Sequence, residues 1–344
     1  PEFVVTGGLW NRPRVNAQSW GDVDGMICVA KEEIDNRTEL RVCYVPCLPL
    51  SSHTVFQNAN SHPLIFRANV NNDDGDPELE ELSNLSEEFG VWLQQDNRYP
   101  DAGLDTSRSV WYHILAILSS PGYNREGFVD SPGGIELPVP IPGPDLLAES
   151  ASLGRQLASL QTLDVNVHQG AELSDAISAF LDAISMEPYS MTGEVSTEAI
   201  LANGLVLDTG HGTSGNIRGR NYRIVNSTPL PPDRVEEICG SLDLDADLVL
   251  DLLGPQLRSI QLSADVALRN VPENILAMNI GTNPVLKKWL AWRCESNVPI
   301  QPVDNLWNDL RLLLRNMIHM RLLFPQLDNN YTNCSVNAYD YPCP

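Results

Sequence analysis

Residues 131–144 form a proline-rich stretch between two segments with helical periodicity. The stretch contains five prolines and three glycines, and proline lacks both the N–H and the free φ that a helix interior or a central strand needs. Before it, apolar residues recur at helical spacing over 110–118 and stop at the Ser-Pro-Gly sequence of 120–122. After it, Pro144 opens a second apolar face over 146–160. The pattern predicts two helices joined by an extended connector.

Short runs rich in β-branched and aromatic residues predict strands near the start of the chain. The clearest runs are 25–30 and 40–45, and 64–66 is a shorter one. The polar and acidic residues of 71–82 predict a solvated loop, after which Ser86 has the position of a helix N-cap. The N-terminal part is therefore expected to be β-rich.

The remainder of the chain alternates between the two patterns. Residues 172–186 are expected to continue the helical part, and residues 204–225 return to β-type runs. A helix is predicted at 232–239, and further helices in the C-terminal third, where 285–292 and 306–322 carry apolar faces. The predicted fold class is mixed α/β of the α+β kind, with a small β-rich part and a helical part. The expected domains are 1–105 (β-rich), 106–200 (helical), 201–270 (β-hairpin and short helices), 271–330 (helical) and a tail at 331–344.

The chain is strongly acidic. It has 22 basic and 45 acidic residues, a net charge of −23 and only three lysines. An anionic surface repels phosphate, so general coating of nucleic acid or of a membrane is excluded, whereas a local basic site is not. No apolar run reaches the ~20 residues that span a bilayer, and no signal peptide is visible. Because its seven cysteines stand mostly in apolar surroundings, the chain is expected to be reduced and cytoplasmic.

One short segment differs in charge, since residues 201–227 hold three arginines and one aspartate. Within it, Gly210–Gly215 has the spacing G-x-G-x-x-G after an apolar strand, a pattern shared with cofactor-binding loops. A cofactor loop needs a helix to open directly after the glycines, whereas Asn216–Tyr222 contains a further glycine and then a β-type run. The preferred interpretation is the projecting tip of a long hairpin over Leu205–Val225, and the cofactor loop is the alternative.

The same segment supplies most of the candidate DNA-binding residues. Arginine bonds guanine edges bidentately and also holds phosphates. The candidates are His211, Asn216, Arg218, Arg220 and Arg223, together with Lys287 and Lys288 from the C-terminal third. The alternative is a solvated hairpin whose arginines pair with nearby acidic residues. From the residues alone, the two remain open.

The sequence predicts no catalytic, cofactor or metal site in this chain. Cys43, Cys47, His53 and His62 have a composition loosely typical of zinc sites, but they lack the second close pair of ligands, so buried strand cysteines are preferred. The signatures of zinc proteases, serine hydrolases and P-loop proteins are absent from the sequence.

Three segments, in order, resemble one protein family. They are WYHILAILSSPGYNR at Trp111–Arg125, ELPVP at Glu136–Pro140 followed by LGRQLASL at Leu153–Leu160, and NIGTNPVLKKWLAWR at Asn279–Arg293. They are similar to segments of the C-terminal region of type ISP restriction–modification enzymes and related phage-defence DNA methyltransferases. Asn84-Leu85-Ser86 and a long helix ending at Leu327-Asp328 also fit the family pattern. The chain departs from it at Gln161, at Asn283-Pro284 and at Asn124.

The resemblance implies a target-recognition domain that follows an N6-adenine methyltransferase domain in the same polypeptide. The S-adenosylmethionine loop and the catalytic tetrapeptide of such enzymes are not in these 344 residues. The chain would therefore be non-catalytic by itself, and S-adenosylmethionine would belong to the parent's catalytic domain. The implied partners are double-stranded DNA, that methyltransferase domain and other defence-system subunits, with no membrane.

The acidic composition supports a second hypothesis. Residues 61–200 hold 5 basic and 23 acidic residues. Such a surface suits docking to a basic partner subunit, or mimicry of DNA that regulates a defence complex. The chain would then be an interaction module.

Overall fold

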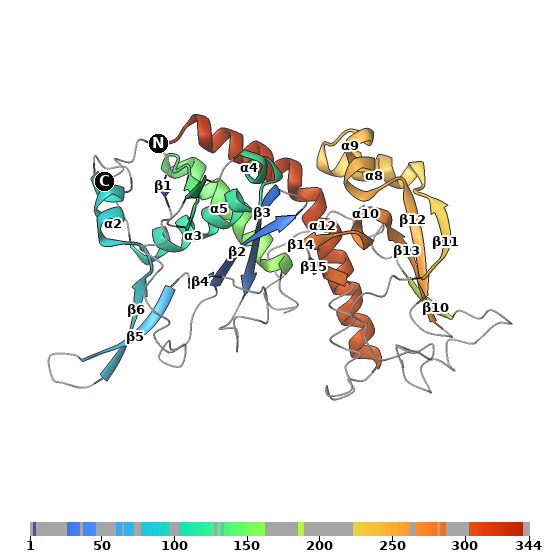
Figure 1. The fold of residues 1–344 in the computed structure, drawn as a ribbon, viewed down its shortest axis with the longest axis horizontal. Helices are drawn as coiled ribbons and strands as arrows, with labels where there is room; N and C mark the ends of the chain where they lie inside the picture. The colour runs from blue at the N-terminus through green and yellow to red at the C-terminus, as the bar shows by residue number, and fades with distance from the viewer. Residues whose placement is uncertain are drawn as a thin grey trace. The chain divides into compact units, whose positions relative to one another are not determined.

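The structure is a computed structural model. It describes residues 3–4, 26–34, 37–45, 60–63, 65–71, 77–95, 99, 103–126, 129–131, 134–161, 185–188, 223–261, 266–280, 283–286 and 303–339. The chain divides into two compact units, which we treat separately. Unit 1 comprises Pro1–Ala171 and Leu323–Pro344, and unit 2 comprises Glu172–Leu322. Figure 1 shows the helices and strands of both. The predicted mixed α/β class is confirmed.

Two packed helices form the core of unit 1. They are α3 (Leu104–Leu118) and α5 (Pro144–Gln161), as the apolar periodicity predicted. The inward residues of α3 are almost fully buried, with Val110 and Ile117 at 0 % exposure. The helices cross at Gly154, where a Cβ atom would lie 1.8 Å from the backbone oxygen of Tyr112. The absence of a side chain at Gly154 therefore permits this close approach.

The proline-rich connector is extended, as predicted, and most of residues 137–142 are buried. It contains the short strands β8 (Gly134–Glu136) and β9 (Pro138–Val139), and β8 pairs with β7 (Val129–Ser131), which ends where the connector begins. β9 pairs with β1 (Phe3–Val4). Three successive carbonyls of the connector accept hydrogen bonds: Pro140 from His113, Ile141 from the backbone N–H of Tyr339, and Pro142 from the hydroxyl of Tyr99. Because proline has no N–H, these carbonyls are the groups that need partners when the stretch is buried.

The β-rich part of unit 1 has two antiparallel sheets. β2 (Met26–Ile34) lies between β3 (Arg37–Val45) and β4 (Asn60–Pro63), and these strands include the predicted runs. β5 (Ile65–Asn71) forms a hairpin with β6 (Pro77–Ser83). The prediction of a loop over 71–82 is therefore wrong for 71 and for 77–82, and 72–76 lie outside the described residues. β6 pairs with β5 along its whole length, and these backbone hydrogen bonds make a strand of a segment whose acidic composition alone disfavours one.

The remaining helices of unit 1 are α2 (Glu87–Gln94), α4 (Pro121–Glu126) and the end of α12 (Val303–Val336). The predicted cap at Ser86 is confirmed, since its hydroxyl accepts from the N–H of Phe89 at 3.2 Å. α12 continues past Asp328, where the family pattern placed the end of the helix. The extension buries Asn330 and Cys334 in unit 1, which stabilises another two turns.

Unit 2 contains a four-stranded antiparallel sheet in the order β10-β13-β12-β11. Its strands are β10 (Ser185–Pro188), β13 (Val266–Pro272), β12 (Gln256–Gln261) and β11 (Arg223–Pro229). The expectation of helix over 172–186 is wrong at its end, because residues 185 and 186 belong to β10 and pair with β13. The rest of 172–186 lies outside the described residues.

Helices α8 (Pro232–Leu242) and α9 (Ala246–Leu253) lie at the end of the sheet where β11 finishes (Figure 1). α8 confirms the helix predicted at 232–239. α10 (Glu273–Leu276) follows β13 directly, and β14 (Asn279–Ile280) pairs with β15 (Asn283–Pro284). Among the helices in the ranges given above, none is long and apolar enough to cross a membrane.

Candidate nucleic-acid interface

Most of the predicted DNA-binding residues lie outside the part of the chain that the structure describes. These are His211, Asn216, Arg218, Arg220, Lys287 and Lys288. Arg223 is the exception, because it is the first residue of β11 and its backbone pairs with Gln261 of β12. The residues 223–225 of the predicted hairpin are thus in a strand, and the partner of that strand is β12.

The sheet of unit 2 brings the two ends of the segment 189–222 to one place. Pro188, the last residue of β10, pairs with Val266, and Gln261 pairs with both Ala267 and Arg223. The chain therefore leaves the sheet after β10 and re-enters it at β11 at the same end. Arg223 lies at that end.

A second polar group lies at the opposite end of β11 and β12. The two terminal nitrogens of Arg258 donate to the carboxylate of Glu273 at 2.5 Å and to the hydroxyl of Ser227 at 2.9 Å. The Ser227 hydroxyl in turn donates to Oε1 of Gln256 at 2.8 Å. The Arg258 side chain is 24 % exposed and the Glu273 side chain 35 %. The four side chains form a continuous hydrogen-bonded row, which we call the Arg258 row.

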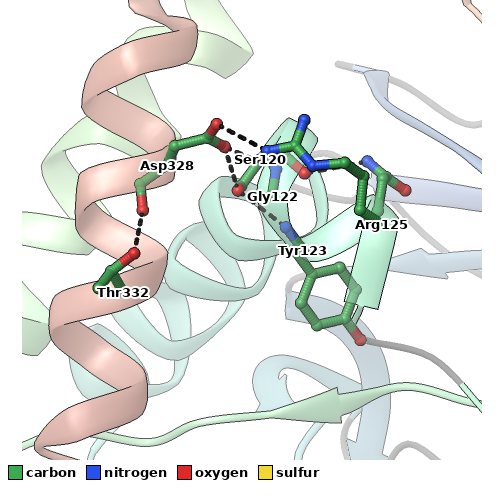
Figure 2. A network of polar contacts seen from close by, with 7 residues as sticks. Ser120, Gly122, Tyr123, Arg125, Asp328 and Thr332 are labelled. Carbon is green, nitrogen blue, oxygen red and sulfur yellow. Dashed lines mark hydrogen bonds and ion pairs between the residues drawn. The ribbon is translucent and has the colours of Figure 1, made fainter.

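In unit 1, Asp328 of α12 connects this helix to the start of α4 (Figure 2). Its Oδ1 accepts from the hydroxyl of Ser120 at 2.6 Å and from the N–H of Gly122 at 2.7 Å. Ser120 also caps α4, because its hydroxyl accepts from the N–H of Tyr123 at 3.1 Å. One carboxylate therefore holds the cap residue and a free N–H of the same helix end.

The other oxygen of Asp328 faces a cation. Oδ2 lies 3.6 Å from a terminal nitrogen of Arg125, whose side chain is 69 % exposed. The backbone oxygen of Asp328 accepts from the hydroxyl of Thr332 one turn later at 3.0 Å, as Figure 2 also shows. With both carboxylate oxygens engaged, Asp328 acts as an anchor between the two helices.

A chain of hydrogen bonds also crosses the buried centre of unit 1. Nε2 of His113 is 2.7 Å from the carbonyl oxygen of Pro140, and Nδ1 is 2.7 Å from the hydroxyl of Ser150. Asn330 donates to that hydroxyl at 2.9 Å, and the thiol of Cys334 donates to Asn330 at 3.6 Å. A carbonyl can only accept, so Nε2 carries the proton, and Nδ1 accepts from Ser150.

Burial determines the protonation states of His113 and Cys334 in this chain of hydrogen bonds. His113 is fully buried, and desolvation lowers its pKa from 6.5 to about 4 although the bond to Pro140 acts in the opposite direction. Burial likewise raises the pKa of the Cys334 thiol to about 12. His113 and Ser150 resemble a nucleophile with its base, but both side chains have 0 % exposure. The pair therefore serves to hold α3, α5, α12 and the connector together.

The unit 2 portion of α12 carries further buried polar groups. Burial, with the nearby Arg315 cation, lowers the pKa of His319 to about 4. Nε of Arg321 donates to the carbonyl oxygen of Leu252 at 3.2 Å, in the last turn of α9. A cation at a helix C-terminus is favourable, so Arg321 joins α9 to α12. Across the described ranges, no group of three or more His, Cys, Asp or Glu side chains could hold a metal ion.

The Arg258 row, the Asp328 anchor and the His113 chain were not predicted. Asp328 and Ser120 are 208 positions apart, and Asn330 and Ser150 are 180 apart. Of these groups, only the His113 chain could have been expected from the sequence. His113 stands within the apolar face of a predicted helix, and a buried histidine needs hydrogen-bond partners.

Comparison with known proteins gives nine similar chains among solved structures, and three of these structures are compared with this chain. The sequence matches no protein-family model and no curated protein. The structures are DrdV in complex with DNA (13 % identity, TM-score 0.46, 89 % of this chain), the ATP-dependent type ISP restriction–modification enzyme LlaBIII bound to DNA (13 %, 0.47, 93 %), and a nuclease-deletion mutant of the type ISP enzyme LlaGI with a DNA substrate mimic (12 %, 0.41, 90 %). The chain spans 24 %, 17 % and 21 % of their lengths, respectively.

Proposed function

We propose that this chain is the DNA sequence-recognition part of a restriction–modification adenine-specific DNA methyltransferase, without catalysis of its own. The observation that carries the proposal is that residues of the family-like segments contact one another in unit 1. His113 of the first segment bonds Pro140 of the second, and Gly154 packs on the backbone of Tyr112. Ser120 and Gly122 bond Asp328, at the end of the family's long helix. These contacts support the resemblance, and the function follows from the resemblance.

The proposed DNA contacts are His211, Asn216, Arg218, Arg220 and Arg223, with Lys287 and Lys288. A few bidentate pairs, each worth about 1–3 kcal/mol, are enough for site-specific recognition. An acidic protein needs such a concentrated basic segment, because its remaining surface repels the duplex. The methyl transfer itself, and S-adenosylmethionine, would belong to another domain of the same polypeptide.

The test is selection from a pool of duplexes with a randomised core by the full 344-residue chain. We expect enrichment of one sequence motif. Replacing both Arg218 and Arg220 by alanine should lower affinity for that motif roughly tenfold or more. The free energy of unfolding should change by less than about 0.5 kcal/mol. The matched control is R234A, since Arg234 pairs with Glu237 on the surface of α8 at 2.7 Å. No enrichment by the wild type would overturn the proposed function.

A second candidate is an acidic interaction module that docks a basic partner or mimics DNA. The net charge of −23 favours it. Retention of a basic defence subunit by the immobilised chain, with no retention of duplex DNA at low salt, would select this function over DNA recognition. Saturable binding of S-adenosylmethionine in calorimetry would instead favour a cofactor site at Gly210–Gly215.

A further inference from the structure

The Arg258 row fixes the direction of each hydrogen bond within it. A hydroxyl has one proton, and Ser227 gives it to Oε1 of Gln256 while accepting from Arg258. The amide oxygen of Gln256 is therefore occupied, and its NH2 group is left to donate outward. Glu273 and Ser227 use two of the five N–H donors of the Arg258 guanidinium, so three are left. Within the described part of the chain, Arg258 has no other hydrogen-bond or ionic partner.

The two side chains with spare donors stand next to each other on one strand. Gln256 and Arg258 are two residues apart on β12, so they project from the same face of the strand. Both are partly exposed, and the bonds that link them to Ser227 are at the surface. The surface there offers a row of fixed donors. This is the chemistry that recognises clustered acceptors, either on the edges of bases or on phosphates.

We infer that Arg258 and Gln256 form a second DNA-contacting pair in unit 2, with Glu273 and Ser227 as positioning residues. The inference rests on the proposed function. It adds a contact surface on a regular strand, separate from the segment that carries Arg218 and Arg220. Residues on strands and helices are placed more accurately than residues on loops, and Arg258 is held by two partners before DNA arrives. Such preorganisation reduces the entropy lost when the side chain is immobilised on the ligand.

Other arginine–carboxylate pairs lack these features. Arg234 and Glu237 are one turn apart on the same helix. Arg108 faces two carboxylates, Glu81 at 2.9 Å and Asp105 at 3.1 Å, so its surroundings carry a net negative charge. The Arg258 row differs from the other described ion pairs in one respect. Its Arg258–Glu273 pair continues through the neutral Ser227 hydroxyl to a second outward-facing donor, the NH2 group of Gln256.

The experiment compares R258A, Q256A and the control R234A in the full chain, using the duplex motif that the wild type selects. We expect R258A to weaken binding about tenfold or more and R234A to leave it unchanged. If Arg258 contacts a base, R258A relaxes the preference at one position of the motif. If it contacts a phosphate, affinity falls evenly for all sequences, and the slope of log K against log salt becomes shallower by about 1. Either outcome supports the inference.

Further variants separate a positioning role from a structural one. R258K keeps the charge but not the planar fork, so it should bind less well than wild type while retaining its thermal unfolding midpoint. E273Q should broaden the sequence preference, because Arg258 loses its fixed orientation; a merely structural Glu273 would lower the unfolding midpoint and leave the preference intact. Wild-type selectivity and affinity in folded R258A, R258K and Q256A would overturn this inference and leave the proposed function standing. Failure of the wild type to select any duplex would overturn both.

Discussion

His113 is neutral in the folded protein because its ring is fully buried, and desolvation disfavours the charged imidazolium. Nε2 faces a carbonyl, and Nδ1 faces a hydroxyl that donates to it. A proton on Nδ1 would reverse this bond, because the Ser150 hydroxyl that now donates would have to accept. In a fully buried position water cannot solvate the resulting charge on the ring. Burial therefore lowers the pKa of His113, and the bond to Pro140 opposes this shift only in part.

The neutral His113 makes stability depend on pH. Its pKa is about 4 in the folded protein and 6.5 as the ordinary value. Between these values the unfolded chain binds more protons, so stability falls as pH decreases. We expect the free energy of unfolding in urea to drop by about 2 kcal/mol from this residue between about pH 7.5 and about pH 5. H113Q removes the titrating group and should flatten the profile. H319Q is the companion variant, because the pKa of His319 is lowered in the same direction. A wild-type profile that is flat in this range would contradict the prediction.

The Asp328 anchor has a stabilising effect that a surface aspartate lacks. Replacing Asp328 by asparagine removes the charge that faces Ser120, Gly122 and Arg125. We expect a loss of about 1–3 kcal/mol in the free energy of unfolding, since hydrogen bonds to charged groups contribute that much. The control is D105N, whose carboxylate also pairs with an arginine, Arg108 at 3.1 Å, but is fully exposed. Equal unfolding midpoints for the two variants would show that the anchor contributes no more than a surface pair.

At the scale of elements, the crossing of α3 and α5 depends on one residue without a side chain. A methyl group at Gly154 would meet the backbone oxygen of Tyr112 at 1.8 Å. Backbone atoms cannot rotate away as a side chain can, so one helix must shift. The neighbouring Arg155 lies over the Tyr112 ring at 5.8 Å, and this contact would move with the helix.

The crossing can be tested with two glycine-to-alanine substitutions. G154A should destabilise unit 1 by about 1–3 kcal/mol or more through overpacking. G90A in α2 is the matched control, because nothing lies within 4 Å of the position of its new Cβ. It should be neutral or stabilise by up to about 1 kcal/mol, as alanine favours helix over glycine. Chemical denaturation of both variants measures the difference, and a stable G154A would mean that the helices cross at a greater distance.

At the scale of the whole molecule, charge opposes both folding and DNA binding. A net charge of −23 repels itself in the compact state. Screening by salt relieves this, because the Debye length falls from about 10 Å at 0.1 M to about 3 Å at 1 M. The same screening weakens arginine contacts to DNA.

Salt should therefore move stability and DNA affinity in opposite directions. We expect the thermal unfolding midpoint to rise with KCl while affinity for the selected duplex falls, with a shallow slope because the proposed interface contacts few phosphates. NaCl at equal concentration is the control, since general screening does not distinguish the two cations. A midpoint that falls with both salts would show that attractive pairs, rather than net repulsion, dominate the electrostatic free energy.

Local patterns determined the helices and the connector of this protein. Periodic apolar residues predicted α3, α5 and α12, and five prolines predicted the extended stretch between α3 and α5. These features depend on residues only a few positions apart along the chain, so the sequence alone predicts them. The residue type of the N-cap placed Ser86 at the start of α2.

The tertiary structure decided the pairing of strands and the partners of polar side chains. β6 and β10 have weak strand patterns and form because β5 and β13 supply the hydrogen bonds. Asp328, His113 and Arg258 acquired their roles from residues of other elements. A hydrogen bond depends on distance and direction in space, and the sequence records neither for residues on different elements.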